Sequence, residues 1–375
     1  MSGQEFRKEN RYCLFLQMIP GIGKVTLRNM LDNIGSPSKV YGAEESVLRD
    51  FMNAAQKEKF LRMRETEKPE ETEAKIISSG IQYFSCFHPK YPKRLLKIED
   101  KPIGLFVKGR LPDENKLTVS VIGTRSNSQY GKKMTEEYAR ILSDYKVDVI
   151  SGMARGIDGI AQKSVIKYKG RTYAVLGSGV DVCYPPEHID LYSQLPDNGG
   201  IISEYRPGTQ PVAGLFPPRN RIISGLSDVV MVMEARLKSG TMITVDMALE
   251  QGKEIFALPG RMTDPLSAGC NALIGQGAGI LPPPDVFEEM IADMTGVKTD
   301  YIKGRNFSVE EMNPTNQWVW DRLKDGPKSV TELWKAWEMT ENKDPFPETE
   351  ILMILAEFGI KNRAKMNILG KWELI

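Results

Sequence analysis

The central part of the chain alternates short apolar runs with longer stretches of helical periodicity. The runs, rich in Val and Ile, are 119–122, 147–150, 172–176, 200–203, 229–233, 255–258 and 279–281. Between the first two, Tyr138, Ile141, Leu142 and Tyr145 recur at helical spacing. Short apolar strands that alternate with helices are typical of a parallel sheet covered on both faces. The sequence therefore predicts an α/β fold with a doubly wound, mostly parallel sheet. Ligands of such folds bind beyond the carboxyl ends of the strands.

The two ends of the chain differ from its centre and predict separate domains. A chain of 375 residues is expected to form two or three domains. Residues 1–85 have a helical pattern, and residues 86–294 hold the predicted sheet. A polar linker covers 295–314, and all five tryptophans lie in 315–375. We expect this last segment to be a small winged-helix-like module. Its acidic residues slightly outnumber its basic ones, which favours a regulatory or protein-contact role over DNA binding.

The composition excludes several classes of protein. Lys and Arg number 50 and Asp and Glu number 49, so the chain has no uniformly basic coat and any anion site must be local. The 4 cysteines form no CxxC pair and there are 2 histidines, which argues against a metal site or a disulfide scaffold. The sequence has no signal-peptide run and no apolar stretch long enough to cross a membrane. We therefore expect a cytoplasmic protein without metal, cofactor or membrane contact.

The turn after the first predicted strand has the residue types of a phosphate site. Gly123 allows a tight exit from the strand, and Thr124 and Arg125 follow it. A helix predicted to begin near Gly131 would direct its backbone N–H groups to the same place. An arginine beside a helix N-terminus suits a phosphate. The alternative is a salt bridge between Arg125 and a neighbouring loop.

Two further turns repeat this combination of small residues and cations. The turn after the second strand supplies Ser151, Gly152, Arg155 and Gly156. Asp158, just beyond it, is expected to cap the next helix and to hold the shape of the loop. The turn near 239 supplies Ser239, Gly240 and Thr241, whose hydroxyl and N–H groups suit an anion. Because these turns share one edge of the sheet, they predict an extended groove for a polyanion.

The segment FPPRNR adds an aromatic residue to the predicted groove. Phe216 precedes two prolines, and Arg219, Asn220 and Arg221 follow them. An aromatic ring beside arginine and asparagine suits a stacked nucleobase with phosphate contacts. The alternative is that Phe216 belongs to the core and that the arginines are solvated.

Several common catalytic motifs are missing from the sequence. No GxxxxGK[ST] occurs, and GSGVDV has Val182 where the third glycine of GxGxxG belongs. There is no GxSxG, and two histidines leave no credible Ser–His–Asp set. These absences argue against a Walker-type ATPase, a dinucleotide-binding enzyme and a Ser–His–Asp hydrolase. Near the N-terminus, IPGIGK resembles the turn of a helix–hairpin–helix motif, whose N–H groups approach DNA phosphates.

Taken in order, the motifs of the middle zone closely resemble the DprA/Smf family of DNA-processing proteins. The series is VIGTR, SGMARGIDGIAQ, GSGVDVCYP, ISEYRPG, FPPRNRIISGLS, VMEARLKSGTMITVDMALEQGKEIFALPG and GCNALIGQGA. The resemblance covers about residues 10–290. It implies a SAM-like helical domain, an extended Rossmann domain and often a small winged helix. It further implies a homodimer through the Rossmann domain, which binds single-stranded DNA without base specificity and delivers it to a RecA-type recombinase in natural transformation, with no turnover chemistry.

The resemblance assigns DNA contacts to particular residues. They include Gly123, Thr124, Arg125, Phe216, Arg219, Asn220 and Arg221. Some members of the family have a Lys or Arg shortly before the phenylalanine, where this chain has Ala213, Gly214 and Leu215. That departure shifts the expected positive charge to Lys132 or the neighbouring lysine.

Two other functions remain open at this point. The family's Rossmann domain is similar to that of the lysine-decarboxylase-like nucleotide phosphoribohydrolases, which are enzymes that bind and hydrolyse nucleotides. Their PGGxGT signature is missing, and Ser239, Gly240 and Thr241 are the nearest match. The other alternative is a sensor that binds a small nucleotide in the same groove.

Overall fold

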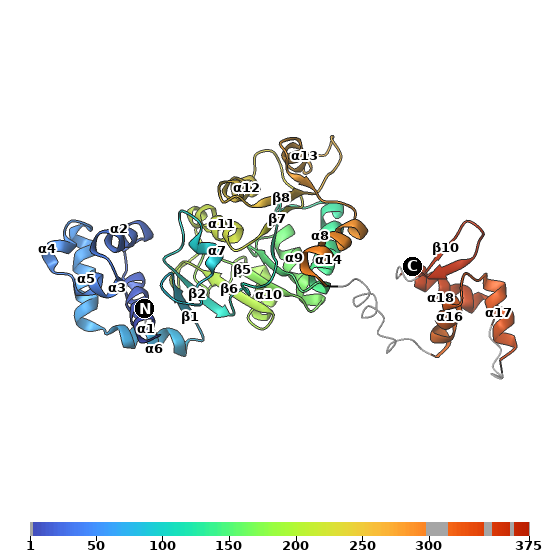
Figure 1. Ribbon diagram of the computed structural model, residues 1–375, viewed down its shortest axis with the longest axis horizontal. Coiled ribbons are helices and arrows are strands. Elements are labelled where there is room, and N and C mark those ends of the chain that lie inside the picture. Colours follow the sequence, from blue (N-terminus) through green and yellow to red (C-terminus); the bar gives the residue numbers. More distant parts are fainter. Residues whose placement is uncertain (1–2, 298–313, 341–346, 361–363, 375) are drawn as a thin grey trace. The chain divides into compact units, whose positions relative to one another are not determined.

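The computed structural model describes residues 3–297, 314–340, 347–360 and 364–374 (Figure 1). These residues form two compact units that divide near residue 300, called unit 1 and unit 2 here. The linker predicted at 295–314 falls almost entirely outside the described residues. The domain boundaries at 85 and 294 stay as proposals. Within the described residues, no helix is long and apolar enough to span a membrane.

Unit 1 is built on one nine-stranded sheet in the part of the chain that is described. The strand order is β1-β2-β6-β5-β4-β3-β7-β8-β9. The strands are β1 (Gln82–Ser85), β2 (Gly104–Gly109), β3 (Thr118–Ile122), β4 (Asp148–Ser151), β5 (Arg171–Val175), β6 (Gly199–Ser203), β7 (Val229–Val232), β8 (Glu254–Ala257) and β9 (Gly279–Ile280). Neighbours from β6 to β9 are parallel, whereas β2 is antiparallel to both β1 and β6. The predicted mostly parallel sheet is confirmed.

The chain reverses its direction of travel across the sheet at the centre. From β3 it proceeds through β4 and β5 to β6, and it then returns to place β7 on the free side of β3. Val119 of β3 pairs with Val229 of β7 in parallel register. The turns that leave β3 and β7 therefore lead to opposite sides. This is the position at which open α/β sheets leave a crevice for a ligand.

Along the chain, helices connect most of the strands, and a further group of helices forms the N-terminal part of unit 1 (Figure 1). The first group is α1 (Gly3–Met18), α2 (Lys24–Ile34), α3 (Pro37–Gly42), α4 (Glu45–Leu48), α5 (Ala54–Thr66) and α6 (Pro69–Ser78). The remainder are α7 (Lys93–Leu96), α8 (Gln129–Asp144), α9 (Ile157–Lys167), α10 (Ile189–Gln194), α11 (Phe216–Gly225), α12 (Gly240–Glu250), α13 (Ala268–Gly275) and α14 (Pro284–Thr295).

Two hydrophobic clusters cover the two faces of the sheet. Successive residues of a strand point to opposite faces, and Phe106 of β2 lies in one cluster while its neighbours Leu105 and Val107 lie in the other. The cluster around Phe106 also contains Phe15 of α1 and Phe60 of α5. The N-terminal helices therefore share a hydrophobic core with the sheet.

The sheet edge at β1 is closed by a side chain. Asn10 of α1 donates from Nδ2 to the carbonyl oxygen of Tyr83 at 3.3 Å, and its Oδ1 accepts from the backbone N–H of Ser85 at 2.7 Å. The amide thus takes the place of a neighbouring strand, which satisfies groups that an open edge leaves unpaired. The apolar runs of the sequence did not identify β1 or β2.

Unit 2 is a small helical module with a strand pair. It consists of α16 (Pro314–Lys324), α17 (Val330–Glu338), α18 (Glu348–Ile360), β10 (Ala364–Met366) and β11 (Trp372–Leu374). The two strands are antiparallel, and Lys328 forms a bridge with Trp372 beside them. Trp320 and Phe358 meet edge to face in its core, with ring centroids 5.6 Å apart. Helices followed by a strand pair agree with the predicted winged-helix-like module.

Asn10 gives a test of the edge closure. Replacing it with alanine removes the partners of two backbone groups, each of which costs about 1–3 kcal/mol when left unsatisfied and buried. We expect Asn10→Ala to lower the free energy of unfolding of unit 1 by about 2–4 kcal/mol, as measured by urea unfolding followed by circular dichroism. Asn33→Ala is the matched control, because the exposed Asn33 side chain bonds within α2 to the Asn29 carbonyl oxygen. Equal losses in the two variants would contradict the assignment.

Candidate nucleic-acid interface

A cleft of about 570 Å³ opens where the chain reverses direction, beyond the carboxyl ends of β3 and β7. Its lining comes from the turns that the sequence singled out. The predicted residues among its lining are Gly123, Thr124, Arg125, Phe216, Arg219, Asn220, Ser239, Gly240 and Thr241. A smaller cavity, of about 20 Å³, is lined by Gly152 and Arg155 together with Arg125, Phe216 and Arg219. The structure therefore brings residues of all four turns together.

The turns after β3 and β4 are fastened to one another. The backbone N–H of Ile157 donates to the carbonyl oxygen of Thr124 at 3.2 Å, and the N–H of Thr124 donates to the carbonyl oxygen of Glu234 at 2.8 Å. Gly156 has a φ of +72°, and a Cβ there would come within 2.3 Å of the Thr124 carbonyl oxygen. Glycine is required at this position by both the backbone conformation and the close contact.

The start of α8 does not serve the cleft in the way that the sequence suggested. Ser128 caps this helix, because its Oγ accepts from the backbone N–H of Gly131 at 3.0 Å. The carboxylate of Glu234 in turn accepts from the N–H of Ser128 at 2.9 Å and from its hydroxyl. The favourable position for an anion at this helix N-terminus is thus occupied by a carboxylate of the protein itself. The start of α8 therefore holds a carboxylate where the sequence suggested a phosphate.

The start of α12 presents the opposite situation. Ser239 precedes the helix, and its side chain forms no capping hydrogen bond. Its Oγ is buried and has no hydrogen-bond partner among the described residues. Ser239, Gly240 and Thr241 all line the cleft. Because the first N–H groups of a helix have no partner within it, this N-terminus offers uncapped donors to an anion.

Arg219 and Asp158 are two buried residues of opposite charge in the lining of the cleft. Arg219 is 5% exposed, and its Nη1 donates to the carbonyl oxygen of Gly152 at 2.9 Å and to that of Val175. Burial lowers the pKa of Arg219 to about 10, against the opposing charge of Asp158, so the guanidinium stays protonated at neutral pH. Burial also raises the pKa of Asp158, and Arg219 opposes that rise. Asp158 Oδ2 accepts from the N–H of Gly152 at 3.1 Å, which holds the loop as expected.

Phe216 is partly exposed and lies among cations and a second aromatic ring. The guanidinium carbons of Arg125 and Arg219 lie 6.0 and 5.9 Å from its ring centroid. The ring of Tyr184 is 5.4 Å away and tilted by 39°. A Cβ on Gly177 would come within 2.8 Å of the Phe216 ring, so the phenylalanine rests on backbone there. Phe216 is not among the buried hydrophobic residues, which argues against a pure core role.

Arg125 is left available by this arrangement. Its side chain is exposed, and it forms no ion pair among the residues that the structure describes. The neighbouring Arg155 instead pairs with Glu187. The expected alternative, a salt bridge from Arg125 to a loop, is therefore not what the described residues show. Arg125 is the exposed cation at the mouth of the cleft.

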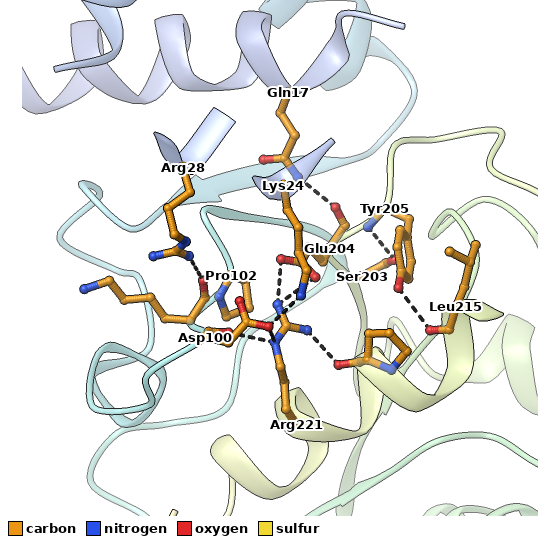
Figure 2. Close-up of polar contacts among 12 residues, drawn as sticks. Gln17, Lys24, Arg28, Asp100, Pro102, Ser203, Glu204, Tyr205, Leu215 and Arg221 are labelled. Carbon is orange, nitrogen blue, oxygen red and sulfur yellow. Dashed lines mark hydrogen bonds and ion pairs between the residues drawn. The ribbon is translucent and has the colours of Figure 1, made fainter. Parts of the chain in front are cut away.

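Four predicted contact residues line neither the cleft nor the smaller cavity, and Gly156 in the turn after β4 is one of them. Lys132 is on α8, half exposed, with its Nζ 3.9 Å from a carboxylate oxygen of Glu136. Ser151 is buried and donates to the Val121 carbonyl oxygen at 2.7 Å. Arg221 is buried in an ion pair with Glu204, as Figure 2 shows. The sequence could not distinguish Arg221 from Arg219, because both belong to the same RNR segment.

Sequence reasoning missed Tyr184 as a lining residue of both cavities. Its position before two prolines in CYPP was the available signal, because prolines restrict the chain and fix the direction of a neighbouring ring. Pro211, Ala213 and Thr244 also line the cleft and were not predicted. They come from a loop and from the second turn of α12, which carry no motif of their own.

The sheet-bearing part of the chain matches a known protein family. The family described as DNA recombination-mediator protein A matches residues 82–292, which is more than half of the chain. The chain belongs to this family. Protein Smf of Escherichia coli is 43% identical over 196 residues, which cover 52% of this chain and 52% of that protein. The matched region therefore spans about half the length of this curated relative.

Solved structures of DNA processing protein A have the same fold. The X-ray structure of the protein from Streptococcus pneumoniae matches with a TM-score of 0.61 and 30% identity, covering 74% of this chain and 95% of that chain. DNA processing protein A from Helicobacter pylori matches with a TM-score of 0.52 and 32% identity, covering 57% of this chain and 97% of that chain. The description of the Helicobacter structure names a unique single-stranded DNA binding mode.

Proposed function

We propose that unit 1 binds single-stranded DNA without base specificity, in the cleft beyond β3 and β7. The observation that carries the proposal is the convergence of uncapped N–H donors, an exposed arginine and a partly exposed phenylalanine on one cleft of about 570 Å³. Single-stranded nucleic acid is bound by a positive groove for its backbone and aromatic rings for its bases. The described binding mode of the Helicobacter relative supports this substrate.

Each part of the cleft has a separate task in this proposal. A phosphate binds the N–H groups at the start of α12, with the hydroxyls of Ser239 and Thr241 beside it. Arg125 clamps a phosphate at the mouth of the cleft, since a guanidinium forms two parallel bonds to phosphate oxygens. A base stacks on Phe216, whose ring accepts any base. Arg219 supplies positive potential from beneath.

We further propose binding without turnover, followed by delivery of the strand to a RecA-type recombinase. Asp158 is the one carboxylate lining the cleft in the described part of the chain, and its Oδ2 is engaged by the N–H of Gly152. We also propose that the protein forms a homodimer through unit 1 and that it is cytoplasmic. The rival function is a nucleotide-binding or nucleotide-hydrolysing enzyme, which would use the same N–H groups at α12 for one mononucleotide.

Arg125→Ala tests the phosphate clamp. A hydrogen bond to a charged group contributes about 1.5–3 kcal/mol, so affinity for unrelated single strands should fall about tenfold or more. The slope of log affinity against log salt should shrink by about 0.7, the value for one phosphate of a single strand. Fluorescence anisotropy at several salt concentrations measures both quantities. Arg171→Ala is the control. Arg171 is the first residue of β5, so it lies at the amino ends of the parallel strands, whereas the cleft lies beyond their carboxyl ends. Unchanged affinity in a folded Arg125→Ala protein would refute the clamp.

Phe216→Leu tests base stacking. Leucine keeps apolar contact with the backbone at Gly177 but has no ring, and stacking contributes about 1–3 kcal/mol per base by alanine substitution. We expect an affinity loss of about five- to tenfold with little change in salt slope. Phe84→Leu makes the same chemical change at a ring that contacts His88, 5.1 Å away between centroids, outside the cleft. Loss of stability with unchanged DNA affinity in Phe216→Leu would show that the ring serves packing alone.

A further inference from the structure

The end of α1 and the start of α2 contact two other segments of unit 1, at Asp100 before β2 and at Glu204 after β6. Lys24 Nζ lies 2.5 Å from Asp100 Oδ2. Gln17 Nε2 donates to the backbone carbonyl oxygen of Glu204 at 2.7 Å. The IPGIGK turn, whose sequence suggests contact with DNA phosphates, therefore has its lysine paired with a half-exposed carboxylate of the protein.

Arg221 of α11 joins the same network. Its side chain is 6% exposed, and Nη2 donates to both carboxylate oxygens of Glu204, at 2.7 and 2.8 Å. Nε donates to the carbonyl oxygen of Asp100 at 2.7 Å, and Nη1 donates to that of Pro218 at 2.7 Å. Asp100 and Glu204 thus each bind Arg221 and a residue of the α1–α2 region (Figure 2). We call this network the seam; it comprises Gln17, Lys24, Asp100, Glu204 and Arg221.

Helix α11 carries both the seam's arginine and several residues of the cleft. Phe216, Arg219 and Asn220 are among the residues that line the cleft, whereas Arg221 is not. Residues of an α-helix advance by about 100° each, so Arg221 lies on a different face from Arg219. Nε and Nη2 of Arg221 bind residues outside α11, Asp100 and Glu204, and these two bonds restrain the helix relative to the rest of unit 1. The bond from Nη1 to the Pro218 carbonyl oxygen lies within α11. The seam therefore holds α11 on one side while the cleft uses the other.

We propose that Arg221 is a positioning residue for the DNA site, and that the N-terminal helical region, through the seam, sets how α11 presents Phe216 and Asn220. This inference rests on the proposed function. A buried ion pair tolerates little change in geometry, because either partner left alone is a buried unpaired charge. Loosening the seam lets α11 shift, and a shifted Phe216 stacks less well on a base.

The test compares Arg221→Met and Lys24→Met in the full chain, which loosen the seam from its two sides. Binding of a fluorescent oligothymidylate should weaken by about tenfold in Arg221→Met and about threefold in Lys24→Met, the size of coupling seen between contacting groups. The salt slope should stay at the wild-type value, because neither change removes a phosphate contact. In a Phe216→Leu background, Arg221→Met should cost less than about twofold, since the two residues act through one contact.

Lys57→Met is the matched control. Lys57 Nζ lies 2.5 Å from Glu45 Oε1, the same separation as in the Lys24–Asp100 pair, but both residues belong to the N-terminal helices away from the seam. Its affinity should equal that of the wild type. If Arg221→Met does not fold, Lys24→Met decides the question, because the Lys24 side chain is 37% exposed and its loss is tolerated more readily.

The outcomes separate this inference from the proposed function. Wild-type affinity in folded Arg221→Met and Lys24→Met, with Arg125→Ala still impaired, overturns the positioning role alone. A reduced salt slope in Arg221→Met also overturns it, because Arg221 would then contact phosphate directly. If Arg125→Ala and Phe216→Leu both bind normally, the proposed function fails, and amide hydrogen exchange decides the rest. Faster exchange along α11 in Arg221→Met then supports the restraint by the seam, and unchanged exchange overturns it.

Discussion

The parallel pairing of β3 with β7 is the contact on which the rest of unit 1 depends. It joins the first strand of the parallel run to the strand that returns after β6, in the register Val119 to Val229. Both strands are buried on both faces, so hydrophobic burial and the ladder hydrogen bonds specify the same pairing. Because the chain leaves the two strands toward opposite sides, their turns part and leave the cleft. The two hydrophobic clusters then fix the helices that deliver the remaining side chains.

The arginines in and near the cleft differ in burial, and burial decides which of them can bind a mobile ligand. Arg219 and Arg221 are both about 95% buried and bonded to protein oxygens, so neither is free to follow a mobile ligand. Arg125 is exposed and lies over the ring of Phe216. A chain with a net charge of +1 thus concentrates positive potential at one place without a basic surface. A carboxylate also decides where an anion can bind, since Glu234 occupies the start of α8, whereas the start of α12 at the cleft has no side-chain cap.

Much of this architecture follows from the sequence, for physical reasons. Continuous apolar runs such as Val229–Val232 identified the parallel strands to within a residue or two, because strands buried on both faces need no alternation. The strands β1 and β2 were missed: β1 is short and alternately exposed, and its edge is closed by Asn10 from far along the chain. The positions of Glu234 and Arg221 were equally hidden, because tertiary contacts and helix rotation decide them. Tyr184 lines the cleft, and it comes from a segment, GSGVDVCYP, to which the sequence assigned no contact residue.

The most direct test of the central claim is the dependence of affinity on strand length. Oligothymidylates from one nucleotide upward would be titrated against the full chain at fixed salt, and the salt slope determined for each. A groove for a polyanion predicts that affinity and salt slope both rise with length until the groove is filled, by about 0.7 in slope for each phosphate bound. A mononucleotide that binds as tightly as a long strand, with a constant salt slope, would contradict the account and favour a nucleotide-binding enzyme or sensor.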